Sequence, residues 1–238
     1  MMGENLTIDE FYKLNDSQLL KTSQSIPGLM LEKWNELLKA YEQIVCLLIS
    51  KGLSGQYSTC KVLAKDDKYK DKVFVVDTNG VSTILRHQFK WALELVKQRK
   101  KGQEIESIIE KANDKFILYI IPKSLTQLVR GGRISKAAAG LAKFLKITPI
   151  LKYNGEIDKY GKERTFKKAI KEVIKVLKDF GNENFIDISY SRVNEEYIDE
   201  VKKIIIAENL KISLLDNMPN TITCHTGKET FALAIWKK

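Results

Sequence analysis

Short apolar segments alternate with amphipathic helical patterns along the first half of this 238-residue chain. The segments at 44–49, 73–76 and 116–121 are continuous apolar runs, and in the longer stretches between them apolar residues recur every three or four positions. A strand that is apolar on both faces is typical of a parallel sheet covered by helices on both sides. The first half therefore predicts an α/β fold built on a largely parallel sheet.

The second half predicts an α/β fold with a mixed sheet. Asn154-Gly155 lies between two strand-like segments and favours a tight hairpin. The predicted helices and strands of this half lie at 124–129, 135–145, 149–153, 156–160, 166–180, 185–190, 195–208, 212–215, 221–225 and 231–236. The simplest architecture has two lobes packed along a cleft, with residues 1–130 in the N-terminal lobe and residues 131–238 in the C-terminal lobe.

The composition excludes several classes of protein. With 44% hydrophobic residues the chain can bury a core, which argues against intrinsic disorder. Its apolar runs fall short of the ~18 residues that a membrane-spanning helix needs, and the start MMGENLTIDE lacks the basic and apolar regions of a secretory signal. Cys46, Cys60 and Cys224 form no C-x-x-C pair, which predicts a reduced cytoplasmic protein without a disulfide or a metal site.

The chain is basic, with 40 Lys and Arg against 30 Asp and Glu and a formal net charge of +10. Such a surplus permits an acidic partner or nucleic acid. The lysines are spread along the amphipathic helices and are not clustered with aromatic residues. We therefore expect solvated helix faces, with neither nucleic acid nor stable membrane insertion.

The loop at 50–55 is the first candidate for a ligand site, because ligands of open α/β sheets bind beyond the carboxyl ends of the strands. Gly52 and Gly55 allow a tight turn, and the Ser54 hydroxyl can donate to an anion held at the start of the following helix. The loop lacks the G-K-[ST] ending of a phosphate-binding loop. It differs from the nucleophile elbow G-x-S-x-G only at Gln56. An ordinary strand-to-helix turn is the alternative.

Two further segments combine polar groups with a turn. Thr22 and Ser23 belong to a run of hydroxyl-bearing residues that can bind a ligand or cap a helix. Gly131 and Gly132 precede Arg133, whose guanidinium suits a carboxylate or phosphate and can equally form a structural salt bridge.

The last candidate is His225, which together with Thr226 precedes Gly227 at the end of a predicted strand. A histidine at the carboxyl end of a strand is a candidate ligand or proton shuttle, although a structural role is the alternative. The other histidine, His87, falls within a predicted helix.

Taken together, these segments resemble the DegV family of bacterial fatty-acid-binding proteins, over nearly the whole chain. Each motif is weak alone, but their order and spacing make the resemblance specific. The motifs are Thr22-Ser23-Gln24, Gly52-Leu53-Ser54-Gly55, Val75-Val76-Asp77-Thr78, Gly131-Gly132-Arg133-Ile134-Ser135, Pro149-Ile150-Leu151 with Asn154-Gly155, Arg164-Thr165, and His225-Thr226-Gly227.

The resemblance implies a two-lobe protein that buries one long-chain fatty acid in the cleft between its lobes. In this family the residues equivalent to Thr22 and Ser54 donate hydrogen bonds to the carboxylate, and those equivalent to Arg133 and His225 form the polar network around it. Gly55 is assigned to the same carboxylate site. The residues assigned to the supporting loops are Ser23, Gly52, Gly131, Gly132 and Thr226.

The resemblance also implies a partner. Proteins of this family present the bound acid to a separate ATP-dependent fatty acid kinase, which forms an acyl-phosphate for phospholipid synthesis. The residue equivalent to Arg164 lies on the surface that meets the kinase. The resemblance thus implies a carrier subunit with no catalytic residue, metal or cofactor of its own.

The chain also departs from the family pattern. Family members usually begin with an additional strand and helix that carry an Asp-Ser-(Ser/Thr) motif, and this sequence starts after that segment. Gln56 stands where Thr is frequent, Thr78 stands where Ser is common, and Lys228-Glu229 replaces the Pro-Gly that usually follows His-Thr-Gly.

Two alternatives remain open. A serine hydrolase could use Ser54 as nucleophile and His225 as base, because the chain order matches that of α/β-hydrolases. The second alternative is a related module that holds no ligand, because the usual first strand is absent from this sequence.

Overall fold

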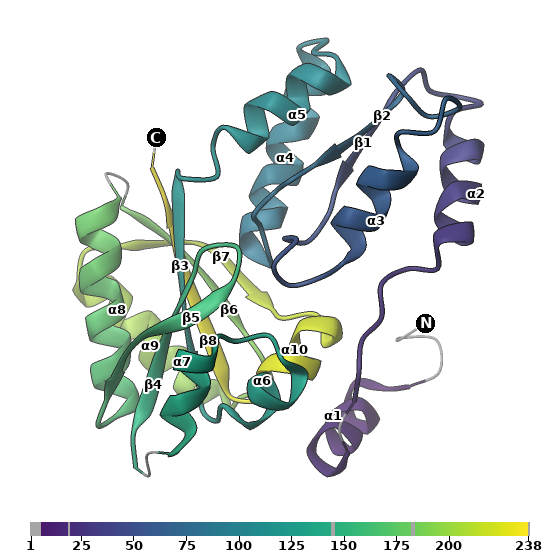
Figure 1. Ribbon diagram of the computed structural model, residues 1–238. Helices are drawn as coiled ribbons and strands as arrows, with labels where there is room; N and C mark the ends of the chain where they lie inside the picture. Colours follow the sequence, from purple (N-terminus) through teal and green to yellow (C-terminus); the bar gives the residue numbers. More distant parts are fainter. Residues whose placement is uncertain (1–5, 19, 144–145, 182–183, 238) are drawn as a thin grey trace. The chain divides into compact units, whose positions relative to one another are not determined.

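The computed structural model describes residues 6–18, 20–143, 146–181 and 184–237. The chain forms two compact units, one made of Met1–Thr22 with Lys115–Lys238 and the other of Ser23–Asp114 (Figure 1). Among the described residues the helices are α1 (Ile8–Ser17), α2 (Pro27–Leu37), α3 (Gln56–Leu63), α4 (Thr83–Lys97), α5 (Gly102–Glu110), α6 (Thr126–Gly131), α7 (Lys136–Ala139), the 3-10 helix η1 (Gly140–Lys143), α8 (Phe166–Phe180), α9 (Glu195–Ala207) and α10 (Asn220–Thr226). The strands are β1 (Ile44–Leu47), β2 (Val73–Val76), β3 (Phe116–Pro122), β4 (Thr148–Tyr153), β5 (Ile157–Glu163), β6 (Phe185–Tyr190), β7 (Lys211–Asn217) and β8 (Thr230–Trp236).

The unit of residues 23–114 is built on a two-stranded parallel sheet, in which β1 pairs with β2 from Ile44↔Val73 to Leu47↔Val76. Helices α2 and α3 pack one apolar cluster against the strands, and α4 and α5 pack a second cluster against them. The prediction of a parallel sheet between two layers of helices is therefore confirmed for these two strands.

The other unit is built on a six-stranded mixed sheet in the order β5-β4-β3-β8-β6-β7. The central strands β3 and β8 pair antiparallel and are almost wholly buried, which explains their continuous apolar sequences. The parallel pair β6–β7 closes one edge and the antiparallel hairpin β4–β5 closes the other. Helices α8 and α9 cover one face of this sheet (Figure 1).

Helix α8 shows how the sequence encodes its element. Its apolar residues recur at helical spacing, and Ile170, Val173 and Leu177 are fully buried against the sheet. The Thr165 side chain accepts a hydrogen bond from the amide of Lys168 and caps the first turn. The opposite face carries exposed lysines, as predicted for a solvated helix face. These lysines are Lys167, Lys168, Lys171, Lys175 and Lys178.

Three predictions about local structure need correction. The segment 221–225 is not a strand but lies in α10, which Pro219 opens and Gly227 ends with a φ of 77°. A threonine-rich run favours a strand, but here Thr223 and Cys224 are buried on a helix against α1, so packing overrides propensity. The apolar segment 116–121 is a strand, but it pairs antiparallel in the mixed sheet and is not part of the parallel one.

The third correction concerns the predicted helix at 135–145. It is a single α-turn, α7, followed by the 3-10 helix η1, and its last two predicted residues lie outside the described residues. The division of the chain also differs from the predicted boundary at residue 130. Because β3 pairs with β4 and β8, residues 115–130 pack with the C-terminal half, and α1 packs there too.

Candidate functional site

Thr22 and His225 form a hydrogen-bonded pair in the unit that holds the six-stranded sheet. Thr22 Oγ1 lies 2.7 Å from His225 Nε2. His225 lies in the last turn of α10, and Thr22 lies after α1 in a segment without regular secondary structure. Two residues that the sequence analysis selected separately are thus brought together.

The environment of His225 favours the neutral imidazole. Burial lowers the pKa of His225 below its ordinary value of 6.5, and the positive charge of Arg133 lowers it further. Nδ1 of the ring is buried and has no hydrogen-bond partner among the described residues. An anion placed near Arg133 and His225 would act in the opposite direction, because a negative charge favours the protonated imidazole.

The turn at the end of α6 is shaped around the His225 ring. A Cβ added to Gly131 would lie 2.4 Å from His225 Nδ1, so glycine provides the space that the ring occupies. Gly132 adopts the left-handed conformation, with φ 62°, and ends the helix. Arg133 Nη1 then donates to the carbonyl of Gly131 at 2.6 Å. The predicted glycine–arginine segment and the predicted histidine therefore form one local structure.

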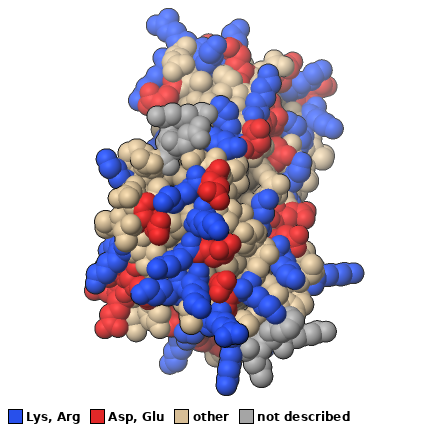
Figure 2. Space-filling view, turned by 90° about the vertical axis from the view of Figure 1, so that its left-hand side faces the viewer, with Lys and Arg blue, Asp and Glu red and all other residues tan. Residues whose placement is uncertain are grey.

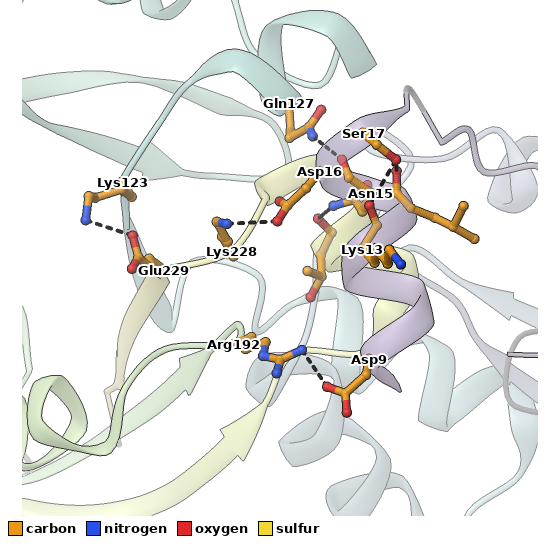
Figure 3. A network of polar contacts seen from close by, with 12 residues as sticks. Asp9, Lys13, Asn15, Asp16, Ser17, Lys123, Gln127, Arg192, Lys228 and Glu229 are labelled. Carbon is orange, nitrogen blue, oxygen red and sulfur yellow. Dashed lines mark hydrogen bonds and ion pairs between the residues drawn. The ribbon is translucent and has the colours of Figure 1, made fainter. Parts of the chain in front are cut away.

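Helix α1 holds α10 and α6 in place (Figure 3). The buried side chain of Asn15 donates to the carbonyl of Thr223 at 3.4 Å, and Gln127 Nε2 donates to the carbonyl of Asn15 at 2.8 Å. Phe11 is fully buried and packs in one cluster with Cys224 of α10. The first helix thus supports the element that carries His225.

Ion pairs surround the same helix (Figure 3). Lys228 pairs with Asp16 at 2.8 Å, and Arg192 of the loop before α9 pairs with Asp9 of α1 at 2.6 Å. A further pair, which does not involve α1, joins Glu229 to Lys123 at 2.7 Å. The two charged residues that replace the family's Pro-Gly are therefore each neutralised by a partner. Thr226 is buried, and its hydroxyl lies 3.4 Å from the Ile222 carbonyl, which gives it a structural contact.

Ser54 lies in the loop between β1 and α3, in the unit of residues 23–114. Its amide donates to the carbonyl of Ser50 at 3.1 Å, and its Oγ accepts from the amide of Gln56 at 3.3 Å. Because a hydroxyl carries one donor and two lone pairs, the Ser54 hydrogen can still be donated to a ligand. Gly52 donates to Ser50 Oγ at 3.2 Å, which tightens the loop, and Gly55 precedes the first turn of α3.

Gln56, where the family often has threonine, connects this loop to the segment that follows Thr22. Its Oε1 accepts from the amide of Ser25 at 3.0 Å. Gln24 in turn accepts a hydrogen bond from Thr59 at 3.0 Å. Ser23, the first residue of this unit, is exposed. The segment is thus anchored to α3 within its own unit.

Arg164 is exposed in the turn between β5 and α8. It lines a hollow of about 360 Å³ whose charged and aromatic lining also includes Lys123, Glu229, Lys146, Phe166 and Tyr197. Lys123 and Glu229 form an ion pair. The side of the protein that carries α8 shows Lys and Arg side chains gathered over it, with Asp and Glu between them (Figure 2). Arg164 therefore lies in an exposed region where basic side chains are interspersed with acidic ones.

Sequence reasoning missed the buried polar residues that support these sites. Asn15 is the clearest case, because it lies one helical turn after Phe11 and so on the buried face of α1. A polar residue on an apolar helical face was the available signal. Gln88 carries the same signal, because it lies on the buried face of α4 with Ile84. Gln127 is only partly buried, and no local pattern marks it.

Three further features concern the part of the chain that the structure describes. No group of three or more His, Cys, Asp or Glu side chains is arranged to hold a metal ion there. Burial raises the pKa of Cys46 to about 12 and that of Cys60 to about 11, so both thiols stay protonated at neutral pH. None of the described helices combines the length and the apolar character that crossing a membrane requires.

Comparison with known proteins gives a consistent result. The family model described as "Uncharacterised protein, DegV family" matches residues 1–238. A DegV domain-containing protein of Staphylococcus aureus is 29% identical over 240 residues, which cover 98% of this chain and 85% of the relative.

Solved structures extend the similarity. The fatty acid binding DegV family protein of Streptococcus agalactiae superimposes with a TM-score of 0.89 at 27% identity, over 99% of this chain and 86% of the other. A DegV family protein of Eubacterium eligens loaded with heptadecanoic acid superimposes with a TM-score of 0.79 at 22% identity, over 99% and 87%, and so shares the fold. From the match along its whole length, we conclude that this chain belongs to the DegV family.

Proposed function

We propose that this protein binds one long-chain fatty acid and presents its carboxylate to a separate ATP-dependent fatty acid kinase. The observation that carries the proposal is the pair of Thr22 and His225, which is held beside Arg133 by the glycine turn. The relative from Streptococcus agalactiae is described as fatty acid binding and matches 99% of this chain.

The protonation of His225 explains how the pair receives an anion. A neutral imidazole has one N–H, and placing it on Nε2 avoids burying an unpaired donor at Nδ1. His225 then donates to Thr22 Oγ1, which leaves the Thr22 hydrogen to donate to the carboxylate. Arg133 supplies the positive charge that offsets the loss of water around the anion.

Ser54 and Gly55 complete the proposed head-group donors. The Ser54 hydroxyl has a hydrogen to donate, and the Gly55 amide lies at the start of α3, where the helix dipole favours an anion. The proposed supporting residues are Ser23, Gly52, Gly131, Gly132 and Thr226. The acyl chain supplies about 0.8 kcal/mol for each CH₂ that it buries.

The kinase contact is assigned to Arg164. An exposed guanidinium suits an acidic partner surface, because it can form paired hydrogen bonds with a carboxylate, and Lys146 lines the same hollow. The protein then needs no phosphate loop or metal of its own, since phosphoryl transfer takes place on the kinase.

A serine hydrolase would need a carboxylate to orient His225 through Nδ1. That atom has no hydrogen-bond partner among the described residues, and the other nitrogen bonds to Thr22. This geometry favours the carrier over the hydrolase.

Calorimetric titration of the delipidated protein with oleic and palmitic acids tests the proposal. We expect saturable binding of one fatty acid per chain. Absence of binding to both acids would support the alternative of a module without ligand. Hydrolysis of a p-nitrophenyl ester that is lost in Ser54→Ala would support the hydrolase.

A further inference from the structure

A buried polar network lies under the loop that carries Ser54. Thr78, in the turn after β2, and Gln88, on α4, are each 1% exposed. Gln88 Nε2 donates to the carbonyl of Thr78 at 2.5 Å. Because a carbonyl can only accept, this contact fixes the orientation of the Gln88 amide.

The Thr78 hydroxyl uses both of its hydrogen-bonding functions. It donates to the carbonyl of Leu48 at 2.5 Å and accepts from the amide of Gly80 at 3.0 Å. Leu48 follows β1 directly, so this single hydroxyl joins the exits of both parallel strands. The turn and the start of the loop are therefore held together by a side chain.

Backbone hydrogen bonds continue the connection to Ser54. The amide of Ser50 donates to the carbonyl of Gly80 at 2.9 Å, and the amide of Ser54 donates to the carbonyl of Ser50 at 3.1 Å. Gln88 is thus connected through Thr78, Gly80 and Ser50 to the backbone of Ser54. All five residues belong to the unit of residues 23–114.

The chemistry of Gln88 is not what packing alone requires. It lies on the buried face of α4 with Ile84, Ala92 and Leu95, where an apolar residue would fit the pattern. Its Oε1 is buried without a hydrogen-bond partner among the described residues and lies against Gly80, where an added Cβ would come within 2.3 Å. A buried polar atom without a partner lowers stability, so its presence needs another explanation.

We propose that Thr78 and Gln88 are positioning residues that hold the Ser54 loop in the conformation that receives the fatty-acid carboxylate. This inference rests on the proposed function of Ser54. Neither residue needs to contact the ligand. They hold the backbone carbonyls and amides of the loop in place before the ligand binds. Binding then does not have to include the free-energy cost of ordering the Ser54 hydroxyl.

Hydrogen exchange tests the positioning itself, without any ligand. Gln88→Leu keeps the size and fills the apolar stripe, and Thr78→Val removes the hydroxyl at nearly constant volume. In both variants the amides of Leu53 and Ser54 should exchange about tenfold faster, while that of Val75 in β2 stays within about twofold. Thr78→Ser, which keeps the hydroxyl, should exchange like the wild type. Unchanged exchange at Ser54 in Gln88→Leu and Thr78→Val would overturn the positioning role.

A double-mutant cycle tests whether the positioning role of Gln88 affects the binding of oleic acid. Gln88→Leu should weaken binding about fivefold or more in the wild-type background and less than about twofold in the Ser54→Ala background. The matched control is Gln103→Leu on α5, which is exposed and should leave binding unchanged in both. Equal weakening in both backgrounds would show that Gln88 acts through something other than Ser54.

The two experiments separate failure of this inference from failure of the proposed function. If the wild type binds oleic acid and Ser54→Ala weakens binding, but Gln88→Leu changes neither exchange nor affinity, only the inference fails. If Gln88→Leu accelerates exchange but Ser54→Ala leaves affinity unchanged, the assignment of Ser54 to the carboxylate fails, and with it the claim that the network serves the ligand.

Discussion

Thr22 Oγ1 and His225 Nε2 lie 2.7 Å apart although 203 positions separate the two residues in the chain. The contact depends on α1, which is buried at Phe11 against Cys224 of α10. The first described helix is therefore part of the structural unit that holds the C-terminal sheet, and it brings a hydroxyl to the one histidine that the resemblance assigns to the ligand site.

Replacing Thr22 with valine removes the proposed donor and keeps the shape of the side chain. Because a hydrogen bond to a charged group contributes roughly 1.5–3 kcal/mol, affinity for a fatty acid should fall about tenfold to a hundredfold. Titration calorimetry measures this, with Thr22→Ser expected near the wild type and the exposed Thr221→Val as the matched control. Unchanged affinity in Thr22→Val would show that Thr22 does not bind the carboxylate.

Ser54→Ala should weaken binding by about tenfold or more for the same reason. The matched control is Ser58→Ala, an exposed position on α3. Thermal unfolding should show that both variants are folded. If Ser54→Ala and Ser58→Ala bind the fatty acid equally well, the carboxylate lies elsewhere.

The lowered pKa of His225 makes both stability and binding depend on pH. In the unfolded chain the imidazole takes up a proton near its ordinary pKa of 6.5, whereas burial and Arg133 lower the pKa in the folded protein. The unfolded state therefore binds more protons between these values, so stability falls as the pH decreases below about 6.5. Urea unfolding at pH 7.5 and 5.0 should show a smaller loss for His225→Gln than for the wild type.

A bound carboxylate should raise the pKa of His225 again, since opposite charges favour the protonated ring. Binding should then take up protons, and affinity should increase as the pH falls from 8 to 6. Calorimetry in two buffers of different ionisation enthalpy measures the uptake. Equal proton uptake by the wild type and His225→Gln would show that ligand binding does not change the protonation of His225.

Gly131→Ala should displace the His225 ring, because the new Cβ would lie 2.4 Å from Nδ1. Overpacking of this kind typically costs about 1–3 kcal/mol, and affinity should fall about tenfold as the ring moves away from Thr22. Gly161→Ala is the control, since an added Cβ meets no atom within 4 Å there. Wild-type affinity in Gly131→Ala would mean that the position of the ring is unimportant for the ligand.

Arg164→Ala should leave fatty acid binding intact and impair presentation of the fatty acid to the kinase. Titration with fatty acid should be unchanged, because Arg164 lies in the exposed turn before α8, whereas acyl-phosphate formation by an added fatty acid kinase should fall about tenfold or more. Lys175→Ala, at an exposed position further along α8, serves as the control. A loss of fatty acid binding in Arg164→Ala would contradict the assigned division of roles.

The sequence predicted those parts of the fold whose patterns are local. The helix Phe166–Phe180 and the strands Val73–Val76 and Phe185–Tyr190 have the predicted bounds, because apolar periodicity and turn residues define them. The assignment of 221–225 to a strand was wrong, because burial against α1 decides the conformation of that segment and no local pattern records it.

The candidate site was predictable in part for the same reason. The motifs identified His225, Thr22 and Gly131, and the structure brings these three together. The hydrogen bonds of the supporting residues were not predictable, although the helical pattern places both Asn15 and Gln88 on buried faces. Asn15 bonds to Thr223 on the helix that carries His225, and Gln88 bonds to Thr78 in the unit that carries Ser54, and only the fold reveals these partners.

Native mass spectrometry of the purified protein, followed by lipid extraction, tests the central claim most directly. The account predicts that the intact chain carries the added mass of one fatty acid, that the extract contains that acid, and that Thr22→Val carries less of it. A wild-type chain that has only its polypeptide mass, and that gains none after incubation with oleic and palmitic acids, would contradict it.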